Sequence, residues 1–200
     1  MKKGWIVFAV ILLLAVFGSV TENAPGHDNV RTAAALNSSV STATPKPTPT
    51  EDPVLASMTM SQKQAYKKAN SYLRTSSFSS KSLIDQLVYS KFDQADAEIA
   101  VAALSIDWKE QALKKAKSYL KTSAFSANGL YDQLLYSGFT SEEGNYGVDN
   151  CGADWKEQAA KKAESYLKTS SFSREGLIDQ LIYSGFTPLE AEYGVQAVGY

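Results

Sequence analysis

Apolar residues recur at helical spacing throughout the chain after residue 57, in short runs separated by polar turns. Between residues 107 and 153 the first stripe consists of Trp108, Ala112, Ala116, Tyr119 and Leu120. A second, shorter stripe consists of Leu130, Leu134 and Leu135. Spacings of three and four residues place side chains on one face of an α-helix. The pattern therefore predicts two short helices with apolar inner faces, followed by a third helix that begins near Thr140.

The same pattern occurs three times at a fixed interval. Phe78, Phe125 and Phe172 are each 47 residues apart, and segments 108–140 and 155–187 agree at 26 of 33 positions without a gap. A period of this length indicates an array of supersecondary units. We therefore predict an all-α fold of three tandem repeats, each with about three short helices in a helix-turn-helix-like arrangement, and we expect packing between neighbours to contribute to stability. The three units are residues 58–106, 107–153 and 154–200.

Capping residues mark the predicted helix starts. Asp107 with Glu110, and Thr140 with Glu143, have the spacing of a capping box, in which the Glu side chain returns to the N-cap backbone. Ser126 is a favourable N-cap for the helix between them. The third unit repeats the two capping patterns as Asp154 with Glu157 and Thr187 with Glu190. The repeat boundaries are thus encoded locally as well as by the apolar stripes.

The first unit departs from the other two. Gly138 and Gly185 follow the second helix of their units and can adopt the left-handed conformation, whereas Lys91 stands at this position in the first unit. The lysine is expected to strain its turn by about 1 kcal/mol. Ser61 replaces the tryptophan of the other units, and Asp93 takes the cap position of the third helix. The first unit therefore resembles a degenerate or capping repeat.

Residues 1–57 have a different character from the repeats. Lys2 and Lys3 precede an apolar run of about 16 residues, which would span about 24 Å and is shorter than the hydrocarbon core of a bilayer. Residues 1–20 are therefore predicted to be a signal peptide or a membrane anchor, with the repeats on the extracytoplasmic side or secreted after cleavage. Residues 21–57 are rich in Ser, Thr and Pro and are predicted to be a disordered linker, which acts as a spacer.

Composition excludes several kinds of chemistry. The chain has one Cys and one His, so a disulfide within the chain, a Ser-His-Asp triad among the repeats and a cysteine-based zinc site are excluded by counting. The acidic residues recur at cap and surface positions, and no phosphate-binding glycine loop is present. We therefore predict a non-catalytic protein with no cofactor and no metal. The formal net charge of −1 argues against a nucleic-acid partner.

One polar group recurs in every unit and is the candidate partner-binding surface. It consists of Asp85, Gln86, Tyr89, Asp132, Gln133, Tyr136, Asp179, Gln180 and Tyr183. Gln133 and Tyr136 are three residues apart and lie off the leucine stripe, so they can share an outer ridge of the helix. The alternative is a structural role, in which each aspartate pairs with a lysine of the preceding helix. The other repeated aromatic residues are predicted to belong to the core.

Two further features have open alternatives. Cys151 aligns with Leu104 and Val198, which favours a buried structural thiol over a redox role. The first helix of each unit is rich in lysine and forms either a solvated face or a surface for anionic cell-wall polymers. The basic residues are Lys63, Lys67, Lys68, Arg74, Lys109, Lys114, Lys115, Lys117, Lys121, Lys156, Lys161, Lys162 and Lys168.

The repeated motif resembles a known family. The segments Phe125–Thr140 and Phe172–Thr187, with the preceding Tyr-Leu-Lys-Thr-Ser and the segment Cys151–Trp155, are similar to the host cell surface-exposed lipoprotein (Ltp) repeat. Members occur in Gram-positive bacteria and their temperate phages, and some phage-encoded members are superinfection exclusion proteins. The resemblance implies a membrane-tethered surface protein that blocks DNA injection by contacting the tape-measure protein of the incoming tail.

The sequence departs from a lipoprotein at one point. No Cys follows the hydrophobic segment, so no lipid anchor is expected, and Lys2–Val20 would serve as a membrane helix or be cleaved. The alternative function is a structural or wall-polymer-binding surface module without a role against phages.

Overall fold

The structure is a computed structural model, and it describes residues 53–200. All regular secondary structure in these residues is α-helical, which confirms the predicted fold class. A short helix, α1 (Pro53–Ala56), precedes the repeats. The first repeat contains α2 (Met60–Thr75), α3 (Ser80–Tyr89) and α4 (Gln94–Ala102). The second contains α5 (Trp108–Thr122), α6 (Ala127–Tyr136) and α7 (Ser141–Asn150), and the third contains α8 (Trp155–Thr169), α9 (Arg174–Tyr183) and α10 (Pro188–Ala197).

The N-terminal predictions fall largely outside this range. The predicted signal or anchor at residues 1–20, and the predicted linker up to residue 52, lie outside the described residues. Helix α1 occupies the end of the segment predicted as linker, so this end is helical. Within residues 53–200, no helix combines the length and apolar character that crossing a bilayer requires.

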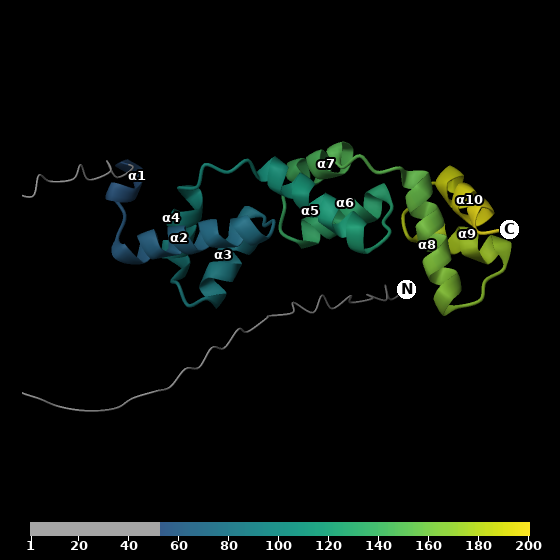
Figure 1. Ribbon diagram of the computed structural model, residues 1–200, viewed down its shortest axis with the longest axis horizontal. Coiled ribbons are helices and arrows are strands. Elements are labelled where there is room, and N and C mark those ends of the chain that lie inside the picture. The colour runs from purple at the N-terminus through teal and green to yellow at the C-terminus, as the bar shows by residue number, and fades with distance from the viewer. Residues whose placement is uncertain (1–52) are drawn as a thin grey trace, which may run out of the picture. The chain divides into compact units, whose positions relative to one another are not determined.

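Each repeat is built on a close pairing of its first and third helices, and the second helix packs against both (Figure 1). In the second and third repeats, the third helix places a buried glycine directly against the first helix. A Cβ added to Gly147 would lie 3.1 Å from the backbone carbonyl carbon of Ala112, and one added to Gly194 would lie 2.8 Å from that of Ala159. Glycine at these positions therefore permits the short distance between helix backbones.

The apolar stripes form three separate cores, one in each repeat. Leu130 and Leu134 have no exposed surface, as the stripe of the second helix predicts, whereas Leu135 is only half-buried. Ala112 and Ala116 of the first helix complete the core of the second repeat, together with Phe139. The leucines of the other repeats are buried in the same way, at Leu83, Leu87, Leu177 and Leu181.

The capping predictions are confirmed for the third helices. The Thr140 hydroxyl accepts from the backbone N–H of Glu143, and the Glu143 carboxylate accepts from that of Thr140 at 2.8 Å. Thr187 and Glu190 form the same box, with Pro188 in the first turn. Ser126 also caps its helix as predicted, because its hydroxyl accepts from the Gly129 N–H.

For the first helices of the second and third repeats, only one of the two hydrogen bonds of the predicted capping box is present. Asp107 accepts from the backbone N–H groups of Lys109 and Glu110, but the Glu110 side chain does not return to the cap. Its carboxylate instead accepts from the Tyr146 hydroxyl of α7, at 2.9 Å. The third repeat has the same bond between Glu157 and Tyr193. Because the neutral phenol donates to a carboxylate, this bond raises the pKa of both tyrosines.

The first repeat uses different caps. Thr59 is the N-cap of α2 and forms a capping box with Gln62, so this helix starts one residue earlier than in the other repeats. Asp93 stands at the N-cap of α4 as predicted, but its side chain makes no capping hydrogen bond. Lys91 has a φ of 72°, which confirms the left-handed turn that the alignment with Gly138 and Gly185 predicts.

Lys91→Gly is expected to stabilise the protein by about 1 kcal/mol, because glycine adopts this φ without the steric cost that a Cβ imposes. Urea unfolding followed by circular dichroism measures the change. Lys67→Gly is the matched control, since Lys67 is an exposed lysine within α2. Glycine in a helix interior should destabilise by about 1 kcal/mol. Destabilisation by both substitutions would contradict the interpretation of the turn.

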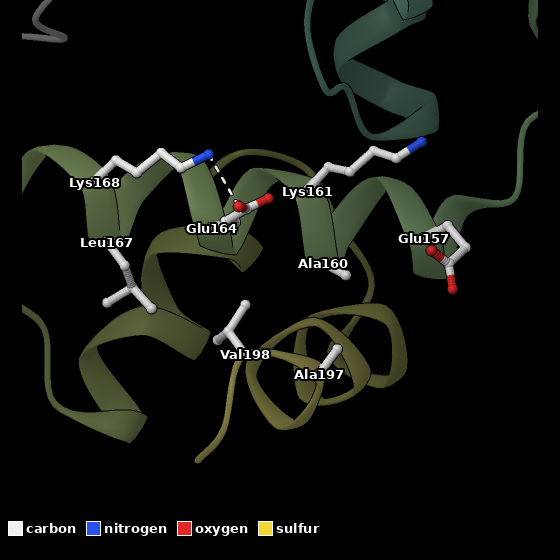
Figure 2. Close-up of a pocket in the computed structure, with 8 residues that line it drawn as sticks. All are labelled: Glu157, Ala160, Lys161, Glu164, Leu167, Lys168, Ala197 and Val198. Atoms are coloured by element: carbon white, nitrogen blue, oxygen red, sulfur yellow. Dashed lines mark ion pairs between the residues drawn. The ribbon is translucent and has the colours of Figure 1, made fainter.

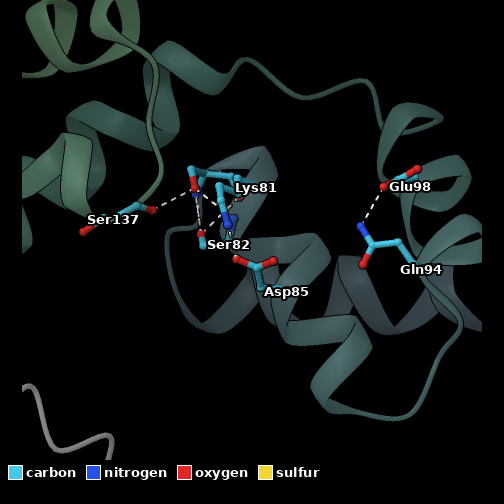
Figure 3. A network of polar contacts seen from close by, with 7 residues as sticks. Lys81, Ser82, Asp85, Gln94, Glu98 and Ser137 are labelled. Carbon is cyan, nitrogen blue, oxygen red and sulfur yellow. Dashed lines mark hydrogen bonds and ion pairs between the residues drawn. The ribbon is translucent and has the colours of Figure 1, made fainter.

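Successive repeats are joined by a buried serine. The Ser79 hydroxyl accepts from the Ser82 N–H at the start of α3 and donates to the carbonyl of Ser137 in the second repeat, at 2.8 Å (Figure 3). Ser126 makes the equivalent bond to the carbonyl of Ser184, at 2.7 Å. The glycine after each carbonyl lies against the same serine. A Cβ on Gly138 would lie 2.8 Å from the Ser79 Oγ.

This contact explains why the first repeat tolerates lysine in its turn. Gly138 and Gly185 must both adopt a positive φ and leave room for a serine of the preceding repeat. Lys91 occupies the same turn in the first of the described repeats, which no other repeat precedes within residues 53–200, and its side chain is exposed. Lysine in place of glycine at position 91 therefore reduces stability only through the backbone strain of its positive φ.

The tryptophans pack against a core, as predicted, but the core that each one covers belongs to the preceding repeat. Trp108 begins α5 of the second repeat but packs against the core of the first. Trp155 begins α8 of the third repeat and packs against the core of the second. Ser61 stands at this position in the first repeat, and within residues 53–200 no other repeat core precedes it. The tryptophan position thus contributes to packing between neighbouring repeats.

Candidate partner-binding surface

The candidate surface lies on the second helix of each repeat, above a polar network that fixes its glutamine. The Ser137 hydroxyl donates its proton to the Gln133 carbonyl at 2.9 Å, so the Tyr119 hydroxyl donates in the 2.6 Å bond between Tyr119 and Ser137. The Gln133 amide donates to the Tyr119 oxygen at 3.4 Å. The third repeat contains the same three contacts among Tyr166, Gln180 and Ser184.

The network places the glutamines away from the ridge that the sequence predicts. Gln86, Gln133 and Gln180 are half-buried, and in the last two repeats the side-chain amide points toward the tyrosine of the first helix. In the first repeat, the pKa of Tyr72 is lowered overall. Burial alone would raise this pKa, but hydrogen bonding with Ser90 and Gln86 and the nearby Lys68 ammonium together outweigh the effect of burial. The glutamines therefore orient the second helix, and the exposed ridge consists of aspartate and tyrosine.

The aspartates of the ridge are exposed. Asp85 accepts from the Lys81 ammonium at 2.7 Å (Figure 3). Lys81 is on the same helix, one turn earlier, so the pairing differs from the predicted pairing with the preceding helix. Asp132 and Asp179 make no ion pair with any described residue. Two of the three carboxylates are thus available to a cation on a partner.

The tyrosines are the most unusual part of this surface. Tyr89, Tyr136 and Tyr183 have exposed fractions of 70%, 79% and 78%. Val88 and Ile182, which precede two of them, are also exposed. The other tyrosine series behaves as the core prediction requires, because Tyr72, Tyr119 and Tyr166 each pack against the phenylalanine of the following turn, with ring centroids about 6 Å apart.

Hollows among the described residues have mixed polar and apolar walls. One of about 630 Å³ lies beside α8 and the end of α10, lined by Leu167, Val198 and the Glu164–Lys168 ion pair at 2.9 Å (Figure 2). In residues 53–200, no group of three or more His, Cys, Asp or Glu side chains has a geometry that would hold a metal ion. Cys151 is buried and its thiol donates to the Val148 carbonyl, which confirms a structural position.

Sequence analysis did not identify two groups of buried polar side chains near the repeat junctions, although the Gln111 side-chain oxygen has no hydrogen-bond partner among the described residues. Gln111 and Gln158 are buried on the first helices, and the Gln158 side-chain oxygen accepts from the backbone N–H of Phe125 in the preceding repeat. The Ser79 and Ser126 hydroxyls make the second contact. The sequence did carry a signal for the tryptophan and glycine contacts, because Ser61 and Lys91 depart from the pattern in the first of the described repeats, which has no described repeat before it.

The described residues define a tandem helical-repeat protein with an aromatic and acidic surface repeated on the second helices. A family model described as host cell surface-exposed lipoprotein matches residues 60–104, 107–151 and 154–198. The chain belongs to this family, with three copies of its repeat. The resemblance of its repeat motifs to this family is therefore confirmed.

Among solved structures, the chain is similar to Ltp, a superinfection exclusion protein from the Streptococcus thermophilus temperate phage TP-J34. The two share 34% sequence identity, and the match covers 46% of this chain and 97% of that chain with a TM-score of 0.44. No curated protein matches the chain.

Proposed function

We propose that this chain is a surface-displayed, non-catalytic binding protein that acts in superinfection exclusion. Membership of the surface-exposed lipoprotein repeat family supports display on the host cell. The observation that carries the binding role is the exposure of Tyr89, Tyr136 and Tyr183, each 70% or more, at the same position of three repeats. Tyrosine is enriched at protein interfaces, where its ring supplies contact area and its hydroxyl a hydrogen bond.

The proposed partner is the tape-measure protein of an incoming phage tail. Each exposed tyrosine offers an aromatic anchor, and Asp132 and Asp179 offer carboxylates to basic side chains of the partner. Three similar surfaces on one chain would raise the effective concentration of each further contact if the partner offers more than one site. The N-terminal segment would hold the repeats at the outer face of the membrane, where the contact stops DNA transfer after the phage has adsorbed.

The test is phage DNA entry into a Gram-positive host that expresses the full chain. Adsorption should be normal and DNA entry blocked. The triple variant Tyr89→Ala, Tyr136→Ala and Tyr183→Ala should restore entry, because truncating an aromatic hot spot costs about 2 kcal/mol of binding or more. Intracellular phage DNA measures entry, and loss of free phage measures adsorption.

The matched control is the double variant Asp149→Ala and Gln196→Ala, which truncates exposed side chains on the third helices. It should block entry as the parent chain does. Circular dichroism checks that each variant is folded. If DNA entry stayed blocked in the triple variant, the tyrosine surface would be rejected as the binding surface. If a broad panel of phages entered normally with the parent chain, the role in superinfection exclusion would be rejected.

A further inference from the structure

A second surface lies on the junction between the first two repeats. A groove of about 420 Å³ is formed by the end of α2, the turn that follows it and one face of α5. Its side chains include four cations and several hydroxyl groups, and neither a carboxylate nor an aromatic ring lines it. The residues used below are Arg74, Lys114, Lys117, Lys121, Ser76 and Ser118.

The four cations of this groove are exposed and make no ion pair with a described residue. Other lysines of the chain do, as Lys109 contacts Glu142 at 2.7 Å. Lys114, Lys117 and Lys121 are three and four residues apart on α5, a spacing at which like charges destabilise a helix. A bound anion would remove this repulsion.

The next junction shows that the positive charge is not needed to join two repeats. Lys161 and Lys168 correspond to Lys114 and Lys121, but Glu164 stands at the position of Lys117 and pairs with Lys168 at 2.9 Å. The junctions otherwise share the same serine bond and tryptophan contact. The concentration of charge at the first junction therefore points to a ligand.

We propose that this groove binds the phosphodiester polymer of the Gram-positive cell wall, a flexible chain of polyol phosphates. Several cations in one groove match successive phosphates, and the Ser76 and Ser118 hydroxyls match the polyol oxygens. Single-stranded nucleic acid is bound with aromatic side chains on which bases stack, and this groove has none. Because the chain as a whole has a formal net charge of −1, any attraction of a polyanion must come from the local cluster of cations in the groove. Binding here is independent of phage exclusion and would hold the repeats within the wall.

The experiment titrates purified full-length chain with poly(glycerol phosphate) by calorimetry at low and moderate salt. Lys117→Glu should weaken binding about tenfold or more and reduce the salt dependence, because fewer phosphates are neutralised. Glu is the natural residue at the equivalent position 164, so the variant should fold. Glu164→Lys should add a second binding site at the next junction.

The matched control is Lys67→Glu, which makes the same charge change at an exposed lysine of α2 that does not line the groove; Lys67 is the first-repeat counterpart of Lys114. Its binding should be close to that of the parent chain. If Lys67→Glu and Lys117→Glu weakened binding equally, the polymer would be responding to the overall charge of the chain, and the groove would be rejected as a specific site. If the chain bound a single-stranded oligonucleotide of equal phosphate number more tightly than the polymer, and Lys117→Glu abolished that binding, the groove would be a nucleic-acid site and the wall polymer would be rejected as its ligand. If poly(glycerol phosphate) did not bind even at low salt, the proposed binding site would be rejected.

Discussion

The second repeat is expected to lose about 2–5 kcal/mol of unfolding free energy in the variant Leu134→Ala, the usual cost of removing a fully buried leucine. Leu134 has no exposed surface, and its Cδ1 atom lies 3.1 Å from the position of a Cβ on Gly147. Truncation would therefore leave a cavity between α6, α7 and α5. Urea unfolding measures the total effect, and hydrogen exchange of α5–α7 measures the effect within the repeat.

Because the three cores are separate, protection in α2–α4 and in α8–α10 should fall less than in α5–α7. Leu189→Ala is the control, since Leu189 has an exposed fraction of 78% and should change stability by less than about 0.5 kcal/mol. An equal loss of protection in all three repeats would show that the cores unfold as one unit and would contradict the expected local effect.

Gly185→Ala is expected to destabilise by about 2–3 kcal/mol through two causes. The φ of 89° costs an alanine about 1–2 kcal/mol. The added Cβ would also lie 2.7 Å from the Ser126 Oγ, so the hydroxyl must move and weaken its bond to the Ser184 carbonyl. Loss of one such hydrogen bond costs about 1 kcal/mol. Urea unfolding measures the sum.

Gly152→Ala separates the two causes. Gly152 also has a positive φ, of 73°, but a Cβ there would contact nothing within 4 Å. Its substitution should cost only the backbone strain, and Gly185→Ala should cost more by about the value of the lost hydrogen bond. If the two variants were equally destabilised, the junction between the second and third repeats would not depend on the Ser126 contact.

The sequence was most informative where a residue acts within its own turn or its own helix. Thr140 with Glu143 and Thr187 with Glu190 cap their helices as predicted, because a capping box involves residues only three apart. The positive φ at Lys91 followed from its alignment with two glycines. The buried leucines followed from helical spacing, because a helix in a small domain has one inner face.

The candidate surface could be predicted only in part. Tyr136 and Asp132 are exposed as the ridge interpretation requires, but Gln133 turns toward Tyr119. A glutamine at a half-buried position can point either way along its helix, and a hydrogen-bond partner on another helix decides between them. Glu110 shows the same limit. Its spacing from Asp107 suits a capping box, but the Tyr146 hydroxyl of α7 competes successfully for its carboxylate.

The sequence alone determined the number of repeats, the helical class, the caps of the third helices and the position of the left-handed turns, because periodicity and short-range hydrogen bonding are properties of local chain geometry. Tertiary structure alone decided how the repeats join. Trp108 and Trp155 lie at helical spacing with their own repeat but pack on the preceding one. The sequence predicts Ser126 as a helix cap, whose hydroxyl oxygen accepts a hydrogen bond. Only the fold brings the Ser184 carbonyl, 58 residues away, to the position where it accepts the proton of that hydroxyl.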